Sequence, residues 1–204
     1  MHFAVRPYLP SDFCTIYRIC HLTSPAAADP ASNAELHGHF YAGPYIHYEP
    51  DLCFVLTGDE EPCGYVLGTR DSTVFAARMQ EWLPPLRKRY PLRPPEDASH
   101  DAELIKCMHA GRSVNKELVA TYPAHLHIDL LPLAQGKKMG HKLMDAFLDR
   151  LTTLGVAGVH LGTNTDNTRA VAFYERAGFQ SKVNGGSALF TMRLPRAARE
   201  SAAT

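Results

Sequence analysis

A strand, a short basic loop and an amphipathic helix follow one another in the middle of the chain. From His125 to Leu131, polar and apolar residues alternate, which is the period of a half-buried strand. Pro132 ends the strand, because proline cannot donate a hydrogen bond to a neighbouring strand. Beyond Gly140, apolar residues recur at helical spacing, namely Leu143, Met144, Phe147, Leu148 and Leu151.

The loop between this strand and this helix predicts an anion-binding turn. The first backbone N–H groups of a helix have no partner within the helix, and the helix dipole makes this end positive. Lys137 and Lys138 add two full charges at the same place. We therefore expect the backbone from about Gln135 to Gly140 to hold a negatively charged group.

Strand and helix patterns on both sides of this unit predict an α/β fold. Strands are expected at Val5–Leu9, Leu52–Thr57, Cys63–Thr69, Val156–Gly162, Phe179–Val183 and Ala188–Leu194. Helices are expected after an N-cap at Ser11 or Asp12, near Leu36–Tyr41, and over Thr73–Tyr90, His100–Leu118 and Thr168–Ala177. The segment Gly43–Asp51 is interpreted as an irregular connection. We expect one domain over residues 1–195, with a helical insertion at about 70–122 and a frayed tail from Arg196 to Thr204.

Composition argues against several classes of protein. Lys and Arg together number 21, as do Asp and Glu, so no net field favours nucleic acid or a membrane surface. No apolar run approaches the roughly 20 residues of a membrane helix. The five cysteines form no CxxC pair and no signal peptide is recognisable, so reduced thiols in a cytoplasmic protein are expected. The histidines near residues 37–47 lack the spacing of a metal site, and none is predicted.

Two motifs resemble those of the GNAT N-acetyltransferases, which use acetyl-coenzyme A. The family loop reads Arg or Gln, two residues, Gly, one residue, then Gly or Ala. Gln135 and Gly140 match it after Pro132, whereas Lys138 stands where the family usually has Gly. The family's N-x-x-A-x-x-F-Y-x-x-x-G-F is matched at every named position, by Asn167, Ala170, Phe173, Tyr174, Gly178 and Phe179. The resemblance implies a GNAT fold, in which helices flank a central mixed and twisted sheet.

A narrower resemblance covers roughly Cys53 to the C-terminus. The words CFVL, CGYVLGT and HIDLLP, with a Trp followed shortly by Pro, are similar to the acetyltransferase-like C-terminal domain of O-GlcNAcase. In those domains the cofactor loop is degenerate. This chain keeps Gln135, Gly136 and Gly140, so the resemblance implies a version nearer to cofactor binding, which we expect to be free-standing, without a hydrolase domain.

The family resemblance implies a site for acetyl-CoA. The loop would hold the pyrophosphate, and the pantetheine arm would insert where the strand at Leu130 and Leu131 parts from the strand at Val159–Gly162. The backbone of Lys138 has two possible conformations. A positive φ would cost roughly 1 kcal/mol of strain, whereas with a negative φ the side chain would simply add its charge near phosphate. The implied cofactor residues are Leu130, Leu131, Gln135, Gly136, Lys137, Lys138, Met139, Gly140, His141, Asn164, Asn167, Ala170, Phe173 and Tyr174.

Three residues are candidates for catalysis. Tyr174 matches the family's general acid, which protonates the departing thiolate, although it could instead be a packed aromatic residue. His127 and Asp129 share one face of the central strand with His125 and are candidate bases. Asp129 could act alone if its pKa is raised, or could orient His127. All three residues could instead line a hydrated sheet face or bond across strands.

Two functions of different kinds follow from these residues. The first is transfer of acetyl from acetyl-CoA to an amine on a small molecule or a peptide. The second is a catalytically silent module that binds acetyl-CoA or a protein. For either function we expect neither nucleic acid nor a membrane as a partner. A homodimer is one option for the assembly.

Overall fold

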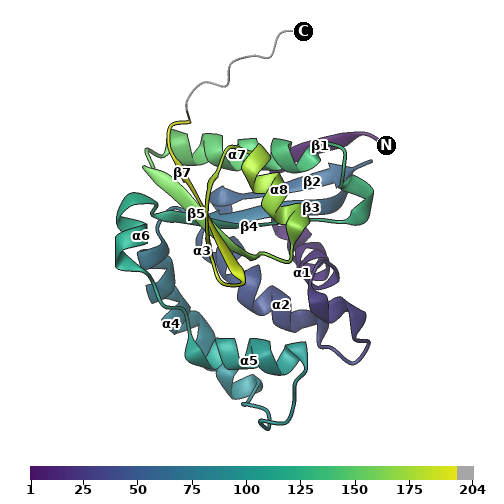
Figure 1. Cartoon of the computed structure of the whole chain (residues 1–204). Helices are drawn as coiled ribbons and strands as arrows, with labels where there is room; N and C mark the ends of the chain where they lie inside the picture. Colours follow the sequence, from purple (N-terminus) through teal and green to yellow (C-terminus); the bar gives the residue numbers. More distant parts are fainter. Residues whose placement is uncertain (197–204) are drawn as a thin grey trace.

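The computed structural model describes residues 1–196, and a mixed seven-stranded sheet lies at its centre (Figure 1). The strands are β1 (Phe3–Pro7), β2 (Cys53–Gly58), β3 (Glu61–Thr69), β4 (Ala124–Leu130), β5 (Gly158–Asn164), β6 (Gln180–Asn184) and β7 (Ser187–Arg193). Their order in the sheet is β1-β2-β3-β4-β5-β7-β6. Only β4 and β5 run parallel, and the other neighbours are antiparallel. The predicted fold class, a GNAT fold with a mixed sheet, is confirmed.

Helices cover both faces of this sheet (Figure 1). They are α1 (Phe13–Leu22), α2 (Ala34–Tyr41), α3 (Gly43–Tyr48), α4 (Ser72–Arg89), α5 (His100–Ala110), α6 (Lys116–Thr121), α7 (Met139–Thr153) and α8 (Thr168–Arg176). α7 and α8 bury their apolar residues with one face of the sheet, whereas α1 to α5 bury theirs with the other. Helices α4 to α6 form the inserted segment between β3 and β4.

β2 and β3 are mostly apolar and buried because both faces of the sheet are covered here. In β3, Val66 packs into the cluster beneath α7, whereas Tyr65 and Leu67 pack into the cluster beneath α1 to α5. Gly68 permits the close approach of α7, because a Cβ at this position would lie 2.4 Å from Cζ of Phe147. The same alternation in β4 places His125 and His127 on the face of the inserted helices.

Several boundaries differ from the sequence predictions. Gly43–Tyr48 is a helix rather than an irregular connection, with Pro44 in its first turn, where proline needs no N–H partner. The helix expected over His100–Leu118 ends at Ala110, because Gly111 has φ of 77°, and α6 then begins separately. The first strand lies two residues earlier than expected.

The predicted tail differs at its first residue. Arg196 forms ion pairs with Asp145 and Asp149 on α7, so this residue is anchored to the helix. The remainder of the predicted tail, residues 197–204, lies outside the described part of the chain.

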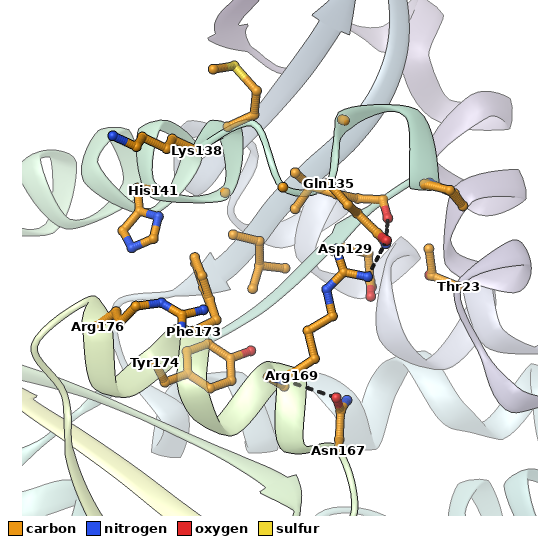
Figure 2. A pocket seen from close by; sticks show the side chains of 18 of the residues that line it. Thr23, Asp129, Gln135, Lys138, His141, Asn167, Arg169, Phe173, Tyr174 and Arg176 are labelled. Carbon is orange, nitrogen blue, oxygen red and sulfur yellow. Dashed lines mark hydrogen bonds between the residues drawn. The ribbon is translucent and has the colours of Figure 1, made fainter.

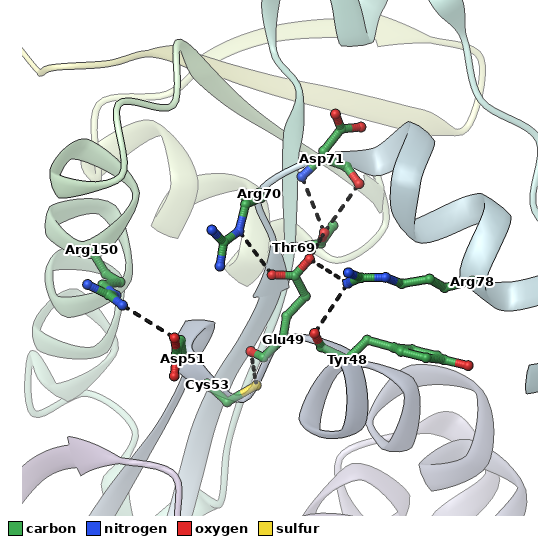
Figure 3. A network of polar contacts seen from close by, with 9 residues as sticks. All are labelled: Tyr48, Glu49, Asp51, Cys53, Thr69, Arg70, Asp71, Arg78 and Arg150. Carbon is green, nitrogen blue, oxygen red and sulfur yellow. Dashed lines mark hydrogen bonds and ion pairs between the residues drawn. The ribbon is translucent and has the colours of Figure 1, made fainter.

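A buried carboxylate joins the inserted helix α4 to the sheet (Figure 3). Glu49 is only 5% exposed and follows α3 directly. Its Oε1 accepts hydrogen bonds from Arg78 at 3.0 Å and Thr69 at 3.3 Å, and its Oε2 accepts from Arg70 at 3.2 Å. Because a buried charge is tolerated only when it is paired, this network fixes α4 against the end of β3.

The two parallel strands stay together for only a short distance. β4 pairs with β5 at Ala124 with Val159 and at His125 with His160, and the pairing then stops. Within residues 1–196, the remainder of β4, up to Leu130, pairs with no strand on this side. The expected parting of the strands is therefore present, and it leaves one edge of β4 open in the middle of the sheet.

Candidate functional site

A cleft of about 610 Å³ lies where β4 and β5 part (Figure 2). One wall is the loop that leads from β4 into α7, and the opposite wall is α8. Eleven of the predicted cofactor residues line it, including Tyr174, the predicted catalytic acid: Leu130, Gln135, Gly136, Lys138, Met139, Gly140, His141, Asn167, Ala170, Phe173 and Tyr174.

Backbone conformation aims the loop at the cleft. A short 3-10 turn, Pro132–Ala134, ends the strand, and Gly136 then adopts φ of 73°. Lys138 has φ of 63° and ψ of 8° and is the N-cap of α7. Of the two alternatives for this residue, the left-handed one is therefore the one present. α7 therefore begins at the cleft lining, where the positive end of a helix favours an anion.

The free edge of β4 offers backbone groups to a ligand. Leu131 N–H donates to Cys63 O on β3 at 2.8 Å, so alternate residues before it also direct their amides to β3. The amides of Ile128 and Leu130 consequently face the gap. Gln135 covers part of this edge, because its Nε2 donates to Leu130 O at 2.7 Å.

Three cations face the cleft: Lys138, Arg169 and Arg176. Arg169 donates from Nη1 to Gln135 Oε1 at 2.5 Å, which links α8 to the loop across the cleft. Neither arginine was among the predicted site residues. Their signal was present in the sequence, since Arg169, Phe173 and Arg176 recur at i, i+4 and i+7 and therefore share one face of α8.

The two groups suited to acid–base chemistry lie at the inner end of the cleft. Tyr174 is 8% exposed, and both burial and the charge of Asp129 raise the pKa of its phenol. Asp129 accepts a hydrogen bond from Tyr65 Oη at 2.6 Å. Burial raises the pKa of the Asp129 carboxyl, although the Tyr65 bond acts in the opposite direction. At neutral pH the phenol therefore keeps its proton and can donate it.

His127 lies behind Asp129 rather than in this cleft. Its Nε2 is 3.1 Å from Tyr45 Oη, and burial lowers the pKa of its ring to about 3. His127 is hydrogen-bonded to Tyr45, whereas Asp129 is hydrogen-bonded to Tyr65. A direct pair in which Asp129 orients His127 is therefore not formed, and this expected alternative is corrected.

Three of the predicted cofactor residues lie outside the cleft lining. Leu131 uses its N–H in the sheet, and its C=O accepts from Ala134. Lys137 places its Nζ over the ring of Phe3, 5.1 Å from the centroid. Asn164 accepts a bond from Asp166 N and lines a neighbouring cavity. Asn167 does line the cleft, and its Oδ1 caps α8 by accepting from Ala170 N at 3.1 Å.

A second cavity of about 490 Å³ adjoins the cleft. Thr23 and Asp129 line both spaces and so mark where they meet. Its other walls come from α1, α2, α5, His127 and the end of β5. Among the residues that line it, the charged side chains other than histidine are Asp129 and Glu103, both carboxylates. We name this space the acceptor-side cavity.

Within residues 1–196, no helix combines the length and the apolar character needed to cross a bilayer. The same residues contain no group of three or more His, Cys, Asp or Glu side chains placed to hold a metal ion.

Known proteins resemble this chain in sequence and in fold. The crystal structure of SsHAT has a TM-score of 0.85 and 40% identity, covering 94% of this chain and 98% of that one. Protein O-GlcNAcase of Mus musculus is 27% identical over 181 residues, which are 86% of this chain. The chain spans only 20% of that relative's length.

A more distant structure shares the fold. It is that of yncA from Salmonella typhimurium, a putative acetyltransferase with its cofactor acetyl-CoA. Its TM-score is 0.58 at 15% identity, covering 98% of this chain and 99% of that one. A model of the acetyltransferase (GNAT) family matches residues 16–179, most of the present sequence. The chain therefore belongs to the acetyltransferase (GNAT) family.

Proposed function

We propose that this protein is an acetyl-CoA-dependent N-acetyltransferase. The observation that carries the proposal is the cleft between α7 and α8, with a cationic outer part and Tyr174 and Asp129 at its inner end. The outer part fits the phosphates of coenzyme A, since backbone amides and helix dipole reinforce Lys138 and Arg176. The free amides of β4 fit the amides of a pantetheine arm.

The bound cofactor supplies an acetyl thioester, and the chain supplies proton transfers. The acceptor amine attacks the thioester carbonyl, a C–N bond forms, and the C–S bond breaks. An acceptor that arrives as an ammonium ion first releases one proton to solvent. Asp129 takes the second proton, which leaves the nitrogen during the attack, because Asp129 lies where the cleft meets the acceptor-side cavity. Tyr174 donates its proton to the departing thiolate, and burial together with the charge of Asp129 keeps the phenol protonated until then by raising its pKa.

The acceptor-side cavity favours an amine that arrives as a cation. Asp129 and Glu103 are carboxylates, and neither lysine nor arginine is among the residues that line this space. An ammonium group gains from these charges, whereas an anionic acceptor would be repelled. A small amine or the amino group of a peptide fits this description.

Release of free thiol from acetyl-CoA, measured with a panel of amines, tests the proposal. We expect turnover with at least one cationic amine. Tyr174→Phe and Asp129→Asn should each lower kcat by about 10²–10⁴-fold, the usual contribution of a positioned acid or base. Acetyl-CoA affinity should change little in Tyr174→Phe. Turnover that is unchanged in both variants would refute these roles.

A binding module without catalysis is the second candidate. The observation that favours it is the bond from Gln135 to Leu130 O, which occupies part of the edge that a pantetheine arm would use. The same assay separates the candidates. Tight acetyl-CoA binding without thiol release for any amine would support the silent module.

A further inference from the structure

Four side chains form an unbroken hydrogen-bonded line across the sheet face beneath the inserted helices. His127 Nε2 lies 3.1 Å from Tyr45 Oη, and Tyr45 Oη lies 2.8 Å from His125 Nε2. His125 Nδ1 lies 2.7 Å from Ser72 Oγ, and Ser72 Oγ lies 2.7 Å from Pro123 O. The line joins β4, α3 and α4, and none of its members other than His127 has entered the proposed chemistry.

The donor of each hydrogen bond can be assigned by starting from Pro123 O, at the end of the line. Pro123 O can only accept, so the single hydroxyl proton of Ser72 is donated to it. Ser72 Oγ must then accept from His125, which carries its proton on Nδ1. Burial keeps His125 neutral by lowering its pKa well below the usual value, so its Nε2 is bare and accepts from Tyr45.

The same counting fixes the tautomer of His127. Tyr45 has one hydroxyl proton, and it is already donated to His125. Tyr45 Oη therefore accepts from His127, whose proton lies on Nε2. His127 is neutral, so its Nδ1 carries a lone pair, and no side chain within residues 1–196 forms a hydrogen bond with that atom.

Packing holds the line in place. Tyr45 is 0% exposed, and its ring stacks on Phe75 with the centroids 4.3 Å apart. Both histidine rings meet the edge of Tyr45, at 5.6 Å for His125 and 5.3 Å for His127. His127 also lines the acceptor-side cavity, two residues before Asp129 on the same face of β4.

We propose that Ser72, His125 and Tyr45 are positioning residues that hold His127 as its Nε2–H tautomer, so that Nδ1 is a fixed hydrogen-bond acceptor for the N–H of the substrate amine. The inference rests on the proposed function and deepens it. Asp129 removes the proton, whereas His127 orients the amine through a second N–H. Because the tautomer is set by bonds remote from the cavity, the substrate does not have to select it.

Nitrogen NMR of the histidine rings tests the tautomer without cofactor or acceptor. In the free protein we expect a protonated Nε2 on His127 and a protonated Nδ1 on His125. Tyr45→Phe should release His127 into a mixture of tautomers, whereas Tyr41→Phe should not. Tyr41 is the matched control, since its ring also meets His127, at 5.2 Å, but no bond joins the two side chains. A protonated Nδ1 on His127, or an unchanged tautomer in Tyr45→Phe, would overturn the inference.

Steady-state kinetics test the role in orientation. Ser72→Ala should raise KM for the acceptor amine about tenfold, the effect of one well-placed hydrogen bond, with KM for acetyl-CoA unchanged. Ser72→Thr retains the hydroxyl and should restore the wild-type value. Equal acceptor KM in wild type and Ser72→Ala would overturn the role. Absence of any acetyl-CoA binding would instead refute the proposed function, while the NMR result on the free protein still decides the tautomer.

Discussion

Substitutions of Lys138 separate the effect of backbone strain from the effect of charge at the loop that we propose holds the cofactor. The φ of 63° at Lys138 lies in the left-handed region, where a residue with a Cβ costs about 1–2 kcal/mol. Glycine removes this cost but loses more chain entropy on folding, about 0.5–1 kcal/mol. We therefore expect Lys138→Gly to raise the free energy of unfolding by about 0.5–1 kcal/mol. For a chain of this size the melting temperature should rise by roughly 1–4 °C.

Two further variants make this prediction specific. Lys138→Ala removes the charge but keeps the Cβ, so its unfolding free energy should stay close to that of wild type. Gly136→Ala is the converse control: φ is 73° and a Cβ would meet nothing within 4 Å, so strain alone should destabilise it. We expect a loss of about 1 kcal/mol there. Urea unfolding of the four proteins measures all of these differences.

Titration of the same proteins with acetyl-CoA measures the contribution of the Lys138 charge to affinity. Lys138→Gly and Lys138→Ala both lack the ammonium group, so acetyl-CoA affinity should fall by a similar factor in each, up to about fivefold for an exposed charge. The difference should shrink at high salt. If Lys138→Gly were no more stable than Lys138→Ala, the reasoning from the left-handed backbone would be refuted.

Three other substitutions test the core and the buried acid. Asp129→Asn should stabilise the protein at neutral pH, because burial raises the pKa of this carboxyl in the folded state and stability is lost as pH rises through that value. In unfolding experiments at several pH values, the gain should shrink as pH falls and disappear below about pH 4, where the acid becomes protonated in both states. Glu49→Gln should cost about 1–3 kcal/mol in urea unfolding by weakening the bonds to its arginines, whereas exposed Glu81→Gln on α4 should cost almost nothing. Gly68→Ala should cost about 1–3 kcal/mol through overpacking, whereas a Cβ at Gly162 would meet only one atom, at 3.9 Å, and Gly162→Ala should fold normally.

Local patterns were sufficient to predict the central strand, the helix after it and the position of the loop between them. The alternation from His125 to Leu131 and the helical spacing from Leu143 to Leu151 each follow from residues close in sequence, and both elements are present. The sequence also identified Lys138 as a residue whose φ could be either positive or negative. Deciding for the positive value required the geometry of the turn between Gly136 and α7.

Contacts between distant residues could not be predicted in this way. Tyr45 lies 80 residues from His125 in sequence, yet its hydroxyl is hydrogen-bonded to two histidines of β4. The segment that contains Tyr45 was expected to be irregular and is a helix. Likewise, Tyr65 on the neighbouring strand β3 donates a hydrogen bond to Asp129. Such partners decide which candidate base faces the cleft, and no periodicity within one element indicates them.

Calorimetric titration with acetyl-CoA is the most direct test that the cleft is the cofactor site. We predict saturable one-to-one binding by the wild-type protein. Arg176→Glu should weaken it at least tenfold at low salt, because a cation of the cleft becomes an anion facing the phosphates. Arg87→Glu, at the far end of α4 and outside the cleft lining, should bind as wild type does. Absence of binding, or equal affinity in Arg176→Glu and wild type, would contradict the account.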